Sequence, residues 1–549
     1  MIKRYCILDC YVDEPACLGV PPFISPYPRY IYGALVHAGV DESRIDYRTI
    51  DALRVHDYRL DAEYEMVFLI GGAAVPGKYL GSRIGTLAEI RRITAYNKKQ
   101  RFAVGGLSSR VLDRAHNTLL IENDIETFAH GYARGAPRDS RRTARDIAAW
   151  SVQGARAVTF HPRYPHVICE IETYRGCPRT SHCSFCAEGV FGSVEFREAG
   201  DIVAEIDALI SHGVSRFRLG RQADILQYKP DFTHLNKGFS KPQIGPIREL
   251  LSALRERTSA GLITILNIDN ANPGTIAQFP EEASRILEEI VKTITPGDTM
   301  ALGIESFDTR VVEANNLKVT GDEAVSAIEL INRIGGIRSE SIPVLLPGVN
   351  LLHGLPGETS ATFEENYRWL AKIRDRGLLV KRINIRQVLP FPGTPLYNKT
   401  FGISRTVENR FKYYRDRIRS EIEHYMLQKI YPVGTVIKNN QILELRAGYS
   451  YGKQIASYSI TAKFPLPLLK NSFYDAVVIG HRERSLITLP FPISINTLPQ
   501  KAIELIPGVG KRMAADIILN RPFATKADAL KLLEGVSDAI ISRFTLLQA

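Results

Sequence analysis

Three cysteines stand within ten residues of one another in the stretch "ETYRGCPRTSHCSFCAEGVFG", residues 172–192. They are Cys177, Cys183 and Cys186, in a chain that has seven cysteines in all. Clustered thiolates are ligands of zinc or of iron-sulfur clusters. A structural zinc site needs a fourth ligand, and His182 stands inside the loop. A 4Fe-4S cluster held by three thiolates has one iron open to a small molecule.

The cysteines follow the first of six apolar segments that alternate with helical or loop segments between about residues 165 and 400. The segments are "HVICEIETYRG", "RFRLGRQADIL", "LITILNIDNANPG", "TMALGIESFD", "VNLLHGLPGET" and "KRINIRQVLPFPGTPLY". This alternation predicts a parallel barrel, full or partial, with its site at the carboxyl ends of the strands. Polar residues at those ends are expected to face the mouth, for example Asn267, Asp269, Asn270, Glu305 and Ser306.

The first 150 residues or so predict a doubly wound α/β module, in which parallel strands alternate with crossover helices. Four strands are expected, at "RYCILDC", "MVFLIGG", "RFAVGG" and "TFAHGYARG". Two of them end in glycine pairs, Gly71-Gly72 and Gly105-Gly106. Paired glycines permit a ligand to approach the carboxyl edge of the sheet, although a tight turn uses the same residues.

The remaining chain changes character after a basic helical stretch. We expect an N-terminal Rossmann-like domain over 1–155, a barrel over 156–400, and a helical linker over 401–430. Period-two alternation predicts a small antiparallel β-barrel over 431–495. The helical segment 496–549 contains Pro507-Gly508-Val509-Gly510 between two apolar faces, as in helix-hairpin-helix units that present backbone amides to phosphate. Such hairpins also serve as packing modules.

The net charge, the apolar runs and the cysteines of the chain limit the classes of function to be considered. The 549 residues carry a net charge of +11, which favours contact with polyanions or marks a merely basic surface. The chain has no run of about 18 apolar residues, so neither a membrane span nor a membrane partner is predicted, and a cytoplasmic location is expected. A reducing compartment keeps unevenly spread cysteines as thiols.

The cysteine loop and the motifs that follow it resemble the radical S-adenosylmethionine (SAM) superfamily. Phe185 directly precedes the third cysteine, and "LGIES", "LLHGLPGET" and "PGTPLY" are similar to the fourth, fifth and sixth strand motifs. The resemblance implies that Cys177, Cys183 and Cys186 ligate a 4Fe-4S cluster whose open iron binds SAM. It also implies that Gly303, Glu305 and Ser306 contact the ribose or carboxylate of SAM, which reductive cleavage turns into a 5'-deoxyadenosyl radical.

Two features depart from the superfamily pattern. The first two cysteines are separated by five residues, whereas the commonest spacing is three. Where many members carry a Gly-Gly-Glu-Pro element for the amino group of SAM, this chain has Gly220-Arg221-Gln222-Ala223. These departures fall on the cysteine loop and on the segment that contacts the amino group of SAM in other members.

The N-terminal module resembles the cobalamin-binding domain of the methyltransferase branch. On that resemblance, Gly71, Gly72, Gly105 and Gly106, with Ser108 close behind, line the nucleotide tail and the corrin. The sequence has no Asp-x-His-x-x-Gly element, so no histidine is expected below the cobalt. The alternative is a degenerate Rossmann domain without a cofactor.

The overall arrangement is similar to the archaeal enzymes that C-methylate a glutamine of methyl-coenzyme M reductase. The resemblance implies methyl transfer from methylcobalamin to an unactivated carbon, the α carbon of a protein glutamine. This would be a post-translational modification linked to methanogenesis, with the α subunit of methyl-coenzyme M reductase as partner. A reductase or other electron donor is also expected.

Two other functions stay open. Residues 431–495 resemble the TRAM module of tRNA methylthiotransferases, which use a second cluster on widely spaced N-terminal cysteines. Here Cys6, Cys10 and Cys17 are crowded together, which favours methyl transfer over methylthiolation. The third function is a non-catalytic iron-sulfur or zinc protein that binds nucleic acid through its C-terminal domains.

Overall fold

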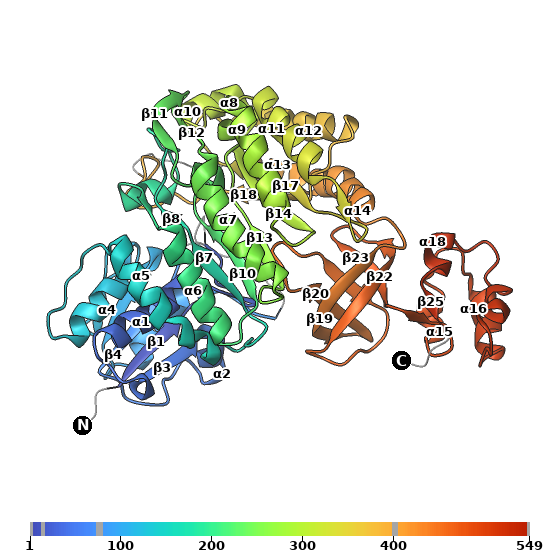
Figure 1. Cartoon of the computed structure of the whole chain (residues 1–549), viewed down its shortest axis with the longest axis horizontal. Helices are drawn as coiled ribbons and strands as arrows, with labels where there is room; N and C mark the ends of the chain where they lie inside the picture. The colour runs from blue at the N-terminus through green and yellow to red at the C-terminus, as the bar shows by residue number, and fades with distance from the viewer. Residues whose placement is uncertain (1–3, 13–16, 73–80, 398–404, 546–549) are drawn as a thin grey trace.

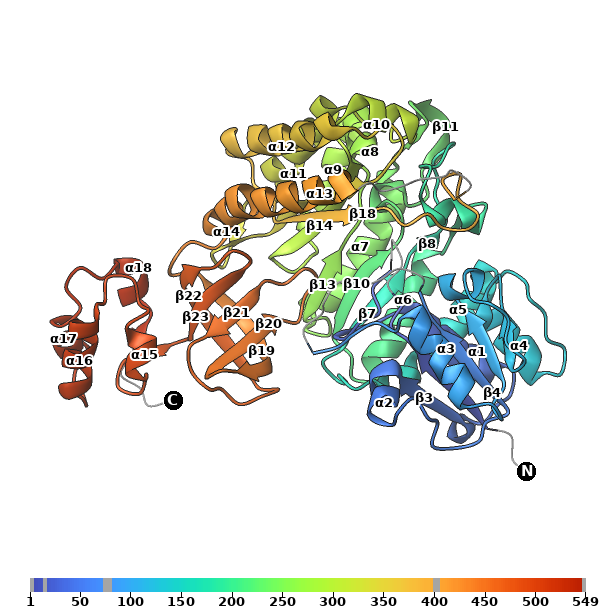
Figure 2. The ribbon, with the colours of Figure 1, turned by 180° about the vertical axis from the view of Figure 1, so that it is seen from behind.

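The computed structural model describes residues 4–12, 17–72, 81–397 and 405–545. Four units follow one another along the chain (Figure 1). The N-terminal α/β unit lies against a parallel barrel, and a small β-barrel separates this parallel barrel from the C-terminal helices (Figures 1 and 2). Within the described residues, no helix is both long enough and apolar enough to cross a membrane.

The N-terminal unit is a parallel five-stranded sheet in the order β3-β1-β4-β5-β6. The strands are β1 (Tyr5–Asp9), β3 (Ile45–Thr49), β4 (Met66–Ile70), β5 (Phe102–Gly105) and β6 (Thr118–Leu120). Side chains of β1 alternate between two cores. Ile7 packs on the side of α1 (Pro26–His37) and α4 (Ile125–Ala133), whereas Leu8 packs on the side of α2 (Ile50–Val55) and α3 (Leu87–Tyr96).

The prediction of a strand at "TFAHGYARG" is wrong, because residues 127–133 belong to α4. The helix buries Ile125, Phe128 and Ala129, which recur at helical spacing along one face. The fourth and fifth strands of the sheet are instead β6 and the edge strand β3, whose buried and half-buried residues alternate. The α/β class of this unit is confirmed. Helix α5 (Ala144–Gln153) then leads into the barrel.

The parallel barrel contains all six predicted strands. They are β7 (Ile168–Glu172), β10 (Arg216–Arg221), β13 (Ile265–Ile268), β14 (Asp298–Glu305), β17 (Leu345–His353) and β18 (Arg382–Gln387). Parallel pairing joins β7, β10 and β13 on one side and β14, β17 and β18 on the other. A single parallel bridge between Ala271 and Leu302 connects the two halves.

The barrel is not closed in the described part of the chain. The short strand β2 (Phe23–Ile24), from the proline-rich N-terminal segment, extends the sheet beyond β7, and β18 forms the opposite edge. We call the gap between β2 and β18 the seam. The fold is therefore a partial barrel, to which the proline-rich N-terminal segment adds an edge strand.

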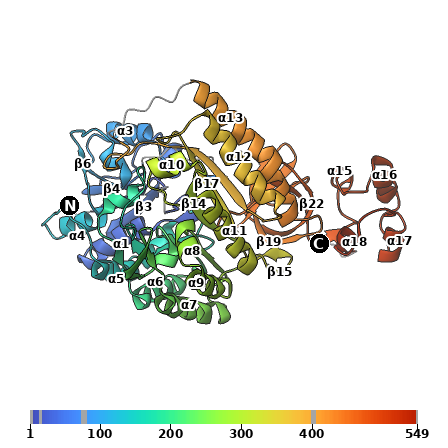
Figure 3. The ribbon, with the colours of Figure 1, turned by 90° about the horizontal axis from the view of Figure 1, so that it is seen from above.

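Helices cover the outside of the barrel because each crossover buries an apolar face against the strands. They are α6 (Ala199–Ser211), α7 (Ile244–Ser259), α8 (Pro273–Gln278), α9 (Pro280–Val291), α10 (Thr309–Ala314), α11 (Gly321–Gly335) and α12 (Ser360–Asp375). Figure 3 shows α13 (Arg405–Ile418) beside α12. A π-helical turn (Arg419–Glu423) and α14 (His424–Ile430) carry the chain to the small barrel.

The small barrel closes in the order β19-β20-β21-β23-β22. Its strands are β19 (Val436–Arg446), β20 (Tyr449–Gln454), β21 (Thr461–Phe464), β22 (Phe473–His481) and β23 (Ser485–Pro490). The prediction of a barrel here is confirmed, but the β21–β23 pair is parallel, whereas an all-antiparallel barrel was expected.

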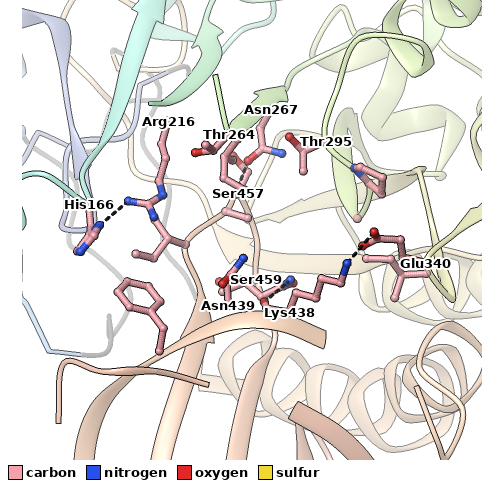
Figure 4. Close-up of a pocket in the computed structure, with 18 of the residues that line it drawn as sticks. His166, Arg216, Thr264, Asn267, Thr295, Glu340, Lys438, Asn439, Ser457 and Ser459 are labelled. Atoms are coloured by element: carbon pink, nitrogen blue, oxygen red, sulfur yellow. Dashed lines mark hydrogen bonds and ion pairs between the residues drawn. The ribbon is translucent and has the colours of Figure 1, made fainter. Parts of the chain in front are cut away.

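The base of the parallel barrel, where its strands begin, is covered by the loop between β20 and β21. The backbone amide of Ser457 donates to Oδ1 of Asn267 at 2.8 Å (Figure 4). The prediction that Asn267 faces the mouth is therefore wrong, because its side chain is engaged at the base. Arg218 lies 5.9 Å from the ring centroid of Tyr458, and Arg382 lies 4.6 Å from it. One loop of the small barrel thus packs against the base of the parallel barrel.

The C-terminal helices pack on the other side of the small barrel. They are α15 (Gln500–Ile503), α16 (Lys511–Leu519), α17 (Lys526–Leu530) and α18 (Asp538–Ile541). Val477, Ile479 and Leu489 of the small barrel belong to the same apolar core as these helices. A short parallel pair, β24 (Ile493–Ser494) and β25 (Phe544–Thr545), joins the start of this unit to its end.

Candidate functional site

The three-cysteine loop leaves the carboxyl end of β7 and is closed by a short hairpin. Strand β8 (Tyr174–Arg175) pairs antiparallel with β9 (Glu195–Phe196), so the loop between them begins and ends at one point. Gly176 has a φ of +86°, which a side chain rarely permits, and starts the turn toward Cys177. The loop is therefore fixed at its base before it reaches the cysteines.

Neighbouring segments hold the loop against the barrel. Nδ2 of Asn316 donates to the carbonyl oxygen of His182 at 2.9 Å, and Oγ of Ser184 donates to Oδ1 of Asn315 at 2.6 Å. The backbone amide of Leu396 donates to the carbonyl oxygen of Ser184 at 2.9 Å. Leu396 lies in the "PGTPLY" turn, so this motif supports the cysteine loop.

Burial keeps the three cysteines as neutral thiols in the protein alone. It raises the pKa of Cys177 to about 12 and the pKa of Cys186 well above its ordinary value. Burial also raises the pKa of Cys183, but Arg179 opposes this effect. Nη1 of Arg179 donates to Sγ of Cys183 at 3.0 Å, which favours the thiolate that a metal requires.

The donor set fits an iron-sulfur cluster better than a single zinc ion. Cys183 raises the pKa of both Cys177 and Cys186, and Cys177 also raises the pKa of Cys186, so the three thiols lie close to one another. Nε2 of His182, the fourth ligand in the zinc alternative, lies 3.3 Å from the carbonyl oxygen of Cys177. Across the part of the chain that the structure describes, no three His, Cys, Asp or Glu side chains converge tightly enough for one metal ion.

The end of β14 brings Glu305 to the cysteine loop. Burial raises the pKa of Glu305 to about 8, and the guanidinium of Arg386 opposes this effect. The Glu305 carboxylate in turn raises the pKa of Cys183. Glu305 has a φ of +64°, and a Cβ at Gly303 would lie 3.3 Å from its Oε1. Cys183, Gly303, Glu305 and Arg386 therefore share one region of the mouth.

Ser306 points elsewhere, although it follows Glu305 directly. Its Oγ accepts from the backbone amide of Asp308 at 3.2 Å and lies 3.4 Å from Oδ1 of Asn366 in α12. In the fifth-strand motif, Nδ1 of His353 lies 2.8 Å from Oε2 of Glu358. The Ser306 hydroxyl and the His353 imidazole therefore each close a turn at the edge of the mouth.

The glycine pairs of the N-terminal sheet meet each other at its carboxyl edge. The backbone amide of Gly71 donates to the carbonyl oxygen of Gly105, and the amide of Ser108 donates to that of Gly71. Gly106 has a φ of +74°, and a Cβ there would lie 2.6 Å from the carbonyl oxygen of Gly71. The Ser108 hydroxyl donates to the carbonyl oxygen of Gly105 at 3.1 Å. Gly72 follows Gly71 immediately.

This glycine edge faces the cysteine loop. A pocket at the edge is lined by Gly106, Leu107 and Arg110 from the N-terminal unit and by Phe191 from the segment after Cys186. Leu107 also shares a small apolar cluster with Ala187. The structure therefore brings the glycine residues and the cysteines to two sides of one interface.

Ion pairs fix this interface. Arg142 donates to Glu126 of α4 at 2.8 Å and to Glu172 of β7 at 2.6 Å. Nη1 of Arg221 donates to Oε1 of Glu188 at 2.9 Å, just beyond the last cysteine. Arg221 belongs to the segment that replaces Gly-Gly-Glu-Pro, so its side chain braces the cysteine loop.

Sequence reasoning missed Arg179 and Arg386. Arg179 stands inside the quoted cysteine stretch, but its contact with sulfur depends on how the loop folds. Arg386 follows Arg382 and Asn384 at a spacing of two in "RINIR", the alternation that puts residues of a strand on one face. That alternation could have placed Arg386 on the same face of the strand as Arg382 and Asn384.

Comparisons with known proteins assign the family. The model of the radical SAM superfamily matches residues 171–370. An uncharacterized protein of Archaeoglobus fulgidus is 36% identical over 533 residues, which cover 95% of this chain and 96% of that protein. One from Methanocaldococcus jannaschii is 37% identical over 88% of this chain and 93% of its own length. The ribosomal protein uS12 methylthiotransferase RimO of Bacteroides fragilis is 26% identical over 36% of this chain and 40% of its own length.

Solved structures are more distant. The methyltransferase TsrM from Kitasatospora setae gives a TM-score of 0.48 with 14% identity over 72% of this chain and 75% of that one. The cobalamin-dependent enzyme OxsB gives 0.43 with 11% identity over 78% and 56%. Because the Archaeoglobus relative matches along almost the whole chain and the family match falls on the barrel, the chain belongs to the radical SAM superfamily, whose cofactors are a 4Fe-4S cluster and SAM.

Proposed function

We propose that this chain is a methyltransferase that moves a methyl group from methylcobalamin to an unactivated carbon. The observation that carries the proposal is the placement of two carboxyl edges. The glycine edge of the N-terminal sheet faces the loop that holds Cys177, Cys183 and Cys186. Ligands of parallel α/β sheets bind at such edges, so two cofactors at this interface would meet.

The three cysteines would hold the cluster, and Arg179 would favour the thiolate of Cys183 through its contact with sulfur. When bound, the cluster and SAM supply radical chemistry, and methylcobalamin supplies the methyl group. Gly303 and Glu305 would position SAM, with Arg386 setting the charge beside Glu305. The turn at Ser306 would hold that strand end in place.

The glycine edge fits a flat cofactor because it presents backbone and little side chain. Gly71, Gly72, Gly105 and Gly106 would lie under the corrin and nucleotide tail. Ser108 would maintain the turn, since its hydroxyl already donates to Gly105. The buried ion pairs of Arg142 would keep the two edges at a fixed distance, which is the main task of a protein whose cofactors supply the reactivity.

The acceptor expected from the resemblance is the α carbon of a glutamine in a protein, with methyl-coenzyme M reductase as its source. A tRNA acceptor is the second candidate. A specific observation favours it: a pocket at the seam is lined by four cationic side chains and no acidic one. With either acceptor, the proposal includes a cytoplasmic location and an electron donor.

The metal content of the protein tests the proposal. Protein purified without oxygen from cells supplied with cobalamin should contain about four irons and about one cobalt per chain. About four irons without cobalt would overturn methyl transfer from cobalamin and keep the radical chemistry. About eight irons would favour methylthiolation, and zinc alone would contradict the cluster ligands.

A further inference from the structure

A cationic pocket lies at the seam between β2 and β18, on the side of the small barrel. Arg163, Arg382, Arg386 and Lys453 line it, and its lining contains no Asp or Glu. Phe23 and Tyr458 contribute aromatic rings to the same pocket. The lining therefore comes from three units of the chain, namely the proline-rich N-terminal segment, the parallel barrel and the small barrel.

These four cations differ from the buried arginines elsewhere in the chain. Arg29, Arg197 and Arg218 each form an ion pair with a carboxylate. Within residues 4–12, 17–72, 81–397 and 405–545, none of the four seam cations has a carboxylate oxygen within 4 Å of its charged nitrogens. Nε of Arg382 instead donates to Oδ1 of Asn384 at 2.6 Å.

Gathering these cations is unfavourable without an anion. Burial lowers the pKa of Lys453, and the neighbouring Arg382 and Arg484 lower it further. Like charges held close together repel, and this repulsion is strongest where water is partly excluded. A bound anion would remove that repulsion, whereas a neutral ligand would leave it in place.

The pocket continues toward the mouth of the barrel. Arg382, Asn384 and Arg386 occupy alternate positions of β18, so they share the inward face of that strand. Arg382 contacts Tyr458 at the base, and Arg386 acts electrostatically on Glu305 at the mouth. A chain-like anion lying along this face would therefore reach the side chains that surround Cys183.

We infer that the seam binds the phosphodiester backbone of an RNA strand and leads its acceptor base to the mouth of the barrel. Cations combined with aromatic rings are the usual composition of grooves for single-stranded nucleic acid. A peptide backbone is uncharged, so a protein substrate would satisfy these cations only if it were strongly acidic. The inference rests on the proposed function in one respect, namely that the acceptor is modified at this same mouth.

Salt-dependent binding tests the inference. Fluorescence anisotropy would measure the dissociation constant of a labelled, unmodified tRNA transcript for the full-length, cluster-loaded protein over a series of KCl concentrations. Each phosphate contact that is lost lowers the slope of log K against log salt by about 0.7 to 0.9. Arg163→Gln, Arg382→Gln, Arg386→Gln and Lys453→Gln should each lower the slope by about that amount.

Matched variants separate the seam from general charge. Arg248→Gln removes an exposed cation from α7 on the outside of the barrel and should leave the slope unchanged. Lys511→Gln and Arg512→Gln remove cations from the C-terminal hairpin and show whether that unit adds contacts of its own. Thermal melting of every variant identifies those whose fold is affected, and these are replaced by the corresponding Met exchanges, which also remove the charge.

Three outcomes would overturn the inference. The slope would be the same in the seam variants and the parent protein, or Arg248→Gln would lower it equally. Alternatively, a labelled Glu-rich peptide would bind the seam more tightly than tRNA, which would identify an acidic protein segment as the ligand. Cobalt content is measured on the same preparations, so protein with cobalt and an unaffected slope contradicts only the RNA inference.

Discussion

The two ends of the parallel barrel differ in whether their buried charged groups form ion pairs. At the base, Arg218 is buried and pairs with both Glu170 and Asp269, and the loop carrying Tyr458 covers them. At the mouth, Glu305 forms no ion pair with any residue that the structure describes, and the guanidinium of Arg386 only partly offsets the effect of burial on its pKa. The same six strands thus have an end where buried charges are ion-paired and an end where a carboxyl has no ion-pair partner among the described residues.

This difference indicates which end does chemistry. Buried charges that satisfy one another stabilise a single arrangement and leave little capacity for a ligand. Burial raises the pKa of Glu170 at the base as well as the pKa of Glu305 at the mouth, but only Glu170 has an ion-pair partner among the described residues. A perturbed carboxyl without such a partner, beside buried thiols, is typical of a functional site. The comparison predicts that changes at the mouth remove activity, whereas changes at the base remove stability.

The largest expected effect comes from Cys183→Ala. Loss of this thiol should abolish both the cluster and SAM cleavage while the melting temperature of cluster-free protein stays close to that of the parent. Iron content and the formation of 5'-deoxyadenosine after anaerobic reduction measure the two losses. Cys169→Ala, inside β7, is the matched control and should retain its iron. Cleavage that persists without Cys183 would contradict its assignment as a ligand.

The sequence predicted those cysteines because their spacing is local. Three thiols within ten residues share a loop whatever the rest of the chain does. The six barrel strands were equally accessible, since each is a short apolar run that ends in polar residues. The failure at "TFAHGYARG" has a local cause, because Gly131 and a short apolar run concealed the helical spacing of Ile125, Phe128 and Ala129.

The partners of the cysteines could not be found in this way. Arg386 lies about 200 residues beyond Cys183 along the chain, and only closure of the barrel places it near Glu305. The bracing of Glu188 by Arg221 likewise requires β10 to pair with β7. Spacing along a sequence identifies ligands on one loop, whereas the charges that adjust them come from distant strands.

A pair of matched substitutions tests the comparison in terms of stability. Glu170→Gln leaves Arg218 with one carboxylate partner in a buried site and should lower the free energy of unfolding by about 3 kcal/mol. Glu305→Gln removes a carboxyl that burial disfavours and that forms no ion pair in the described part of the chain, so it should not lower that free energy.

Equilibrium unfolding in urea would measure both, and SAM cleavage would be assayed on the same proteins. Glu305→Gln should lose cleavage despite its normal stability. If Glu305→Gln were the less stable of the two variants, the division between the two ends would be wrong.

A smaller effect is expected from the loop that covers the base. Tyr458→Ala removes a ring that lies between Arg218 and Arg382. Each cation–π contact stabilises by about 0.5 to 2 kcal/mol, so the free energy of unfolding should fall by about 1 to 3 kcal/mol. Tyr458→Phe keeps the ring and should retain most of that energy. Equal stability of the Ala and Phe variants would show that the ring contributes little to holding this loop on the base.

The smallest effect concerns the glycine edge, which faces the mouth from the N-terminal sheet. Ser108→Ala removes the hydrogen bond to Gly105 and should cost about 1 kcal/mol of unfolding free energy. Ser82→Ala removes an exposed hydroxyl and should cost nothing measurable. Because the Ser108 hydroxyl is already engaged, cobalt content should be unchanged in the variant. Loss of cobalt with unchanged stability would mean that this hydroxyl contacts the cofactor directly, and the glycine edge would then resemble the mouth more than the base.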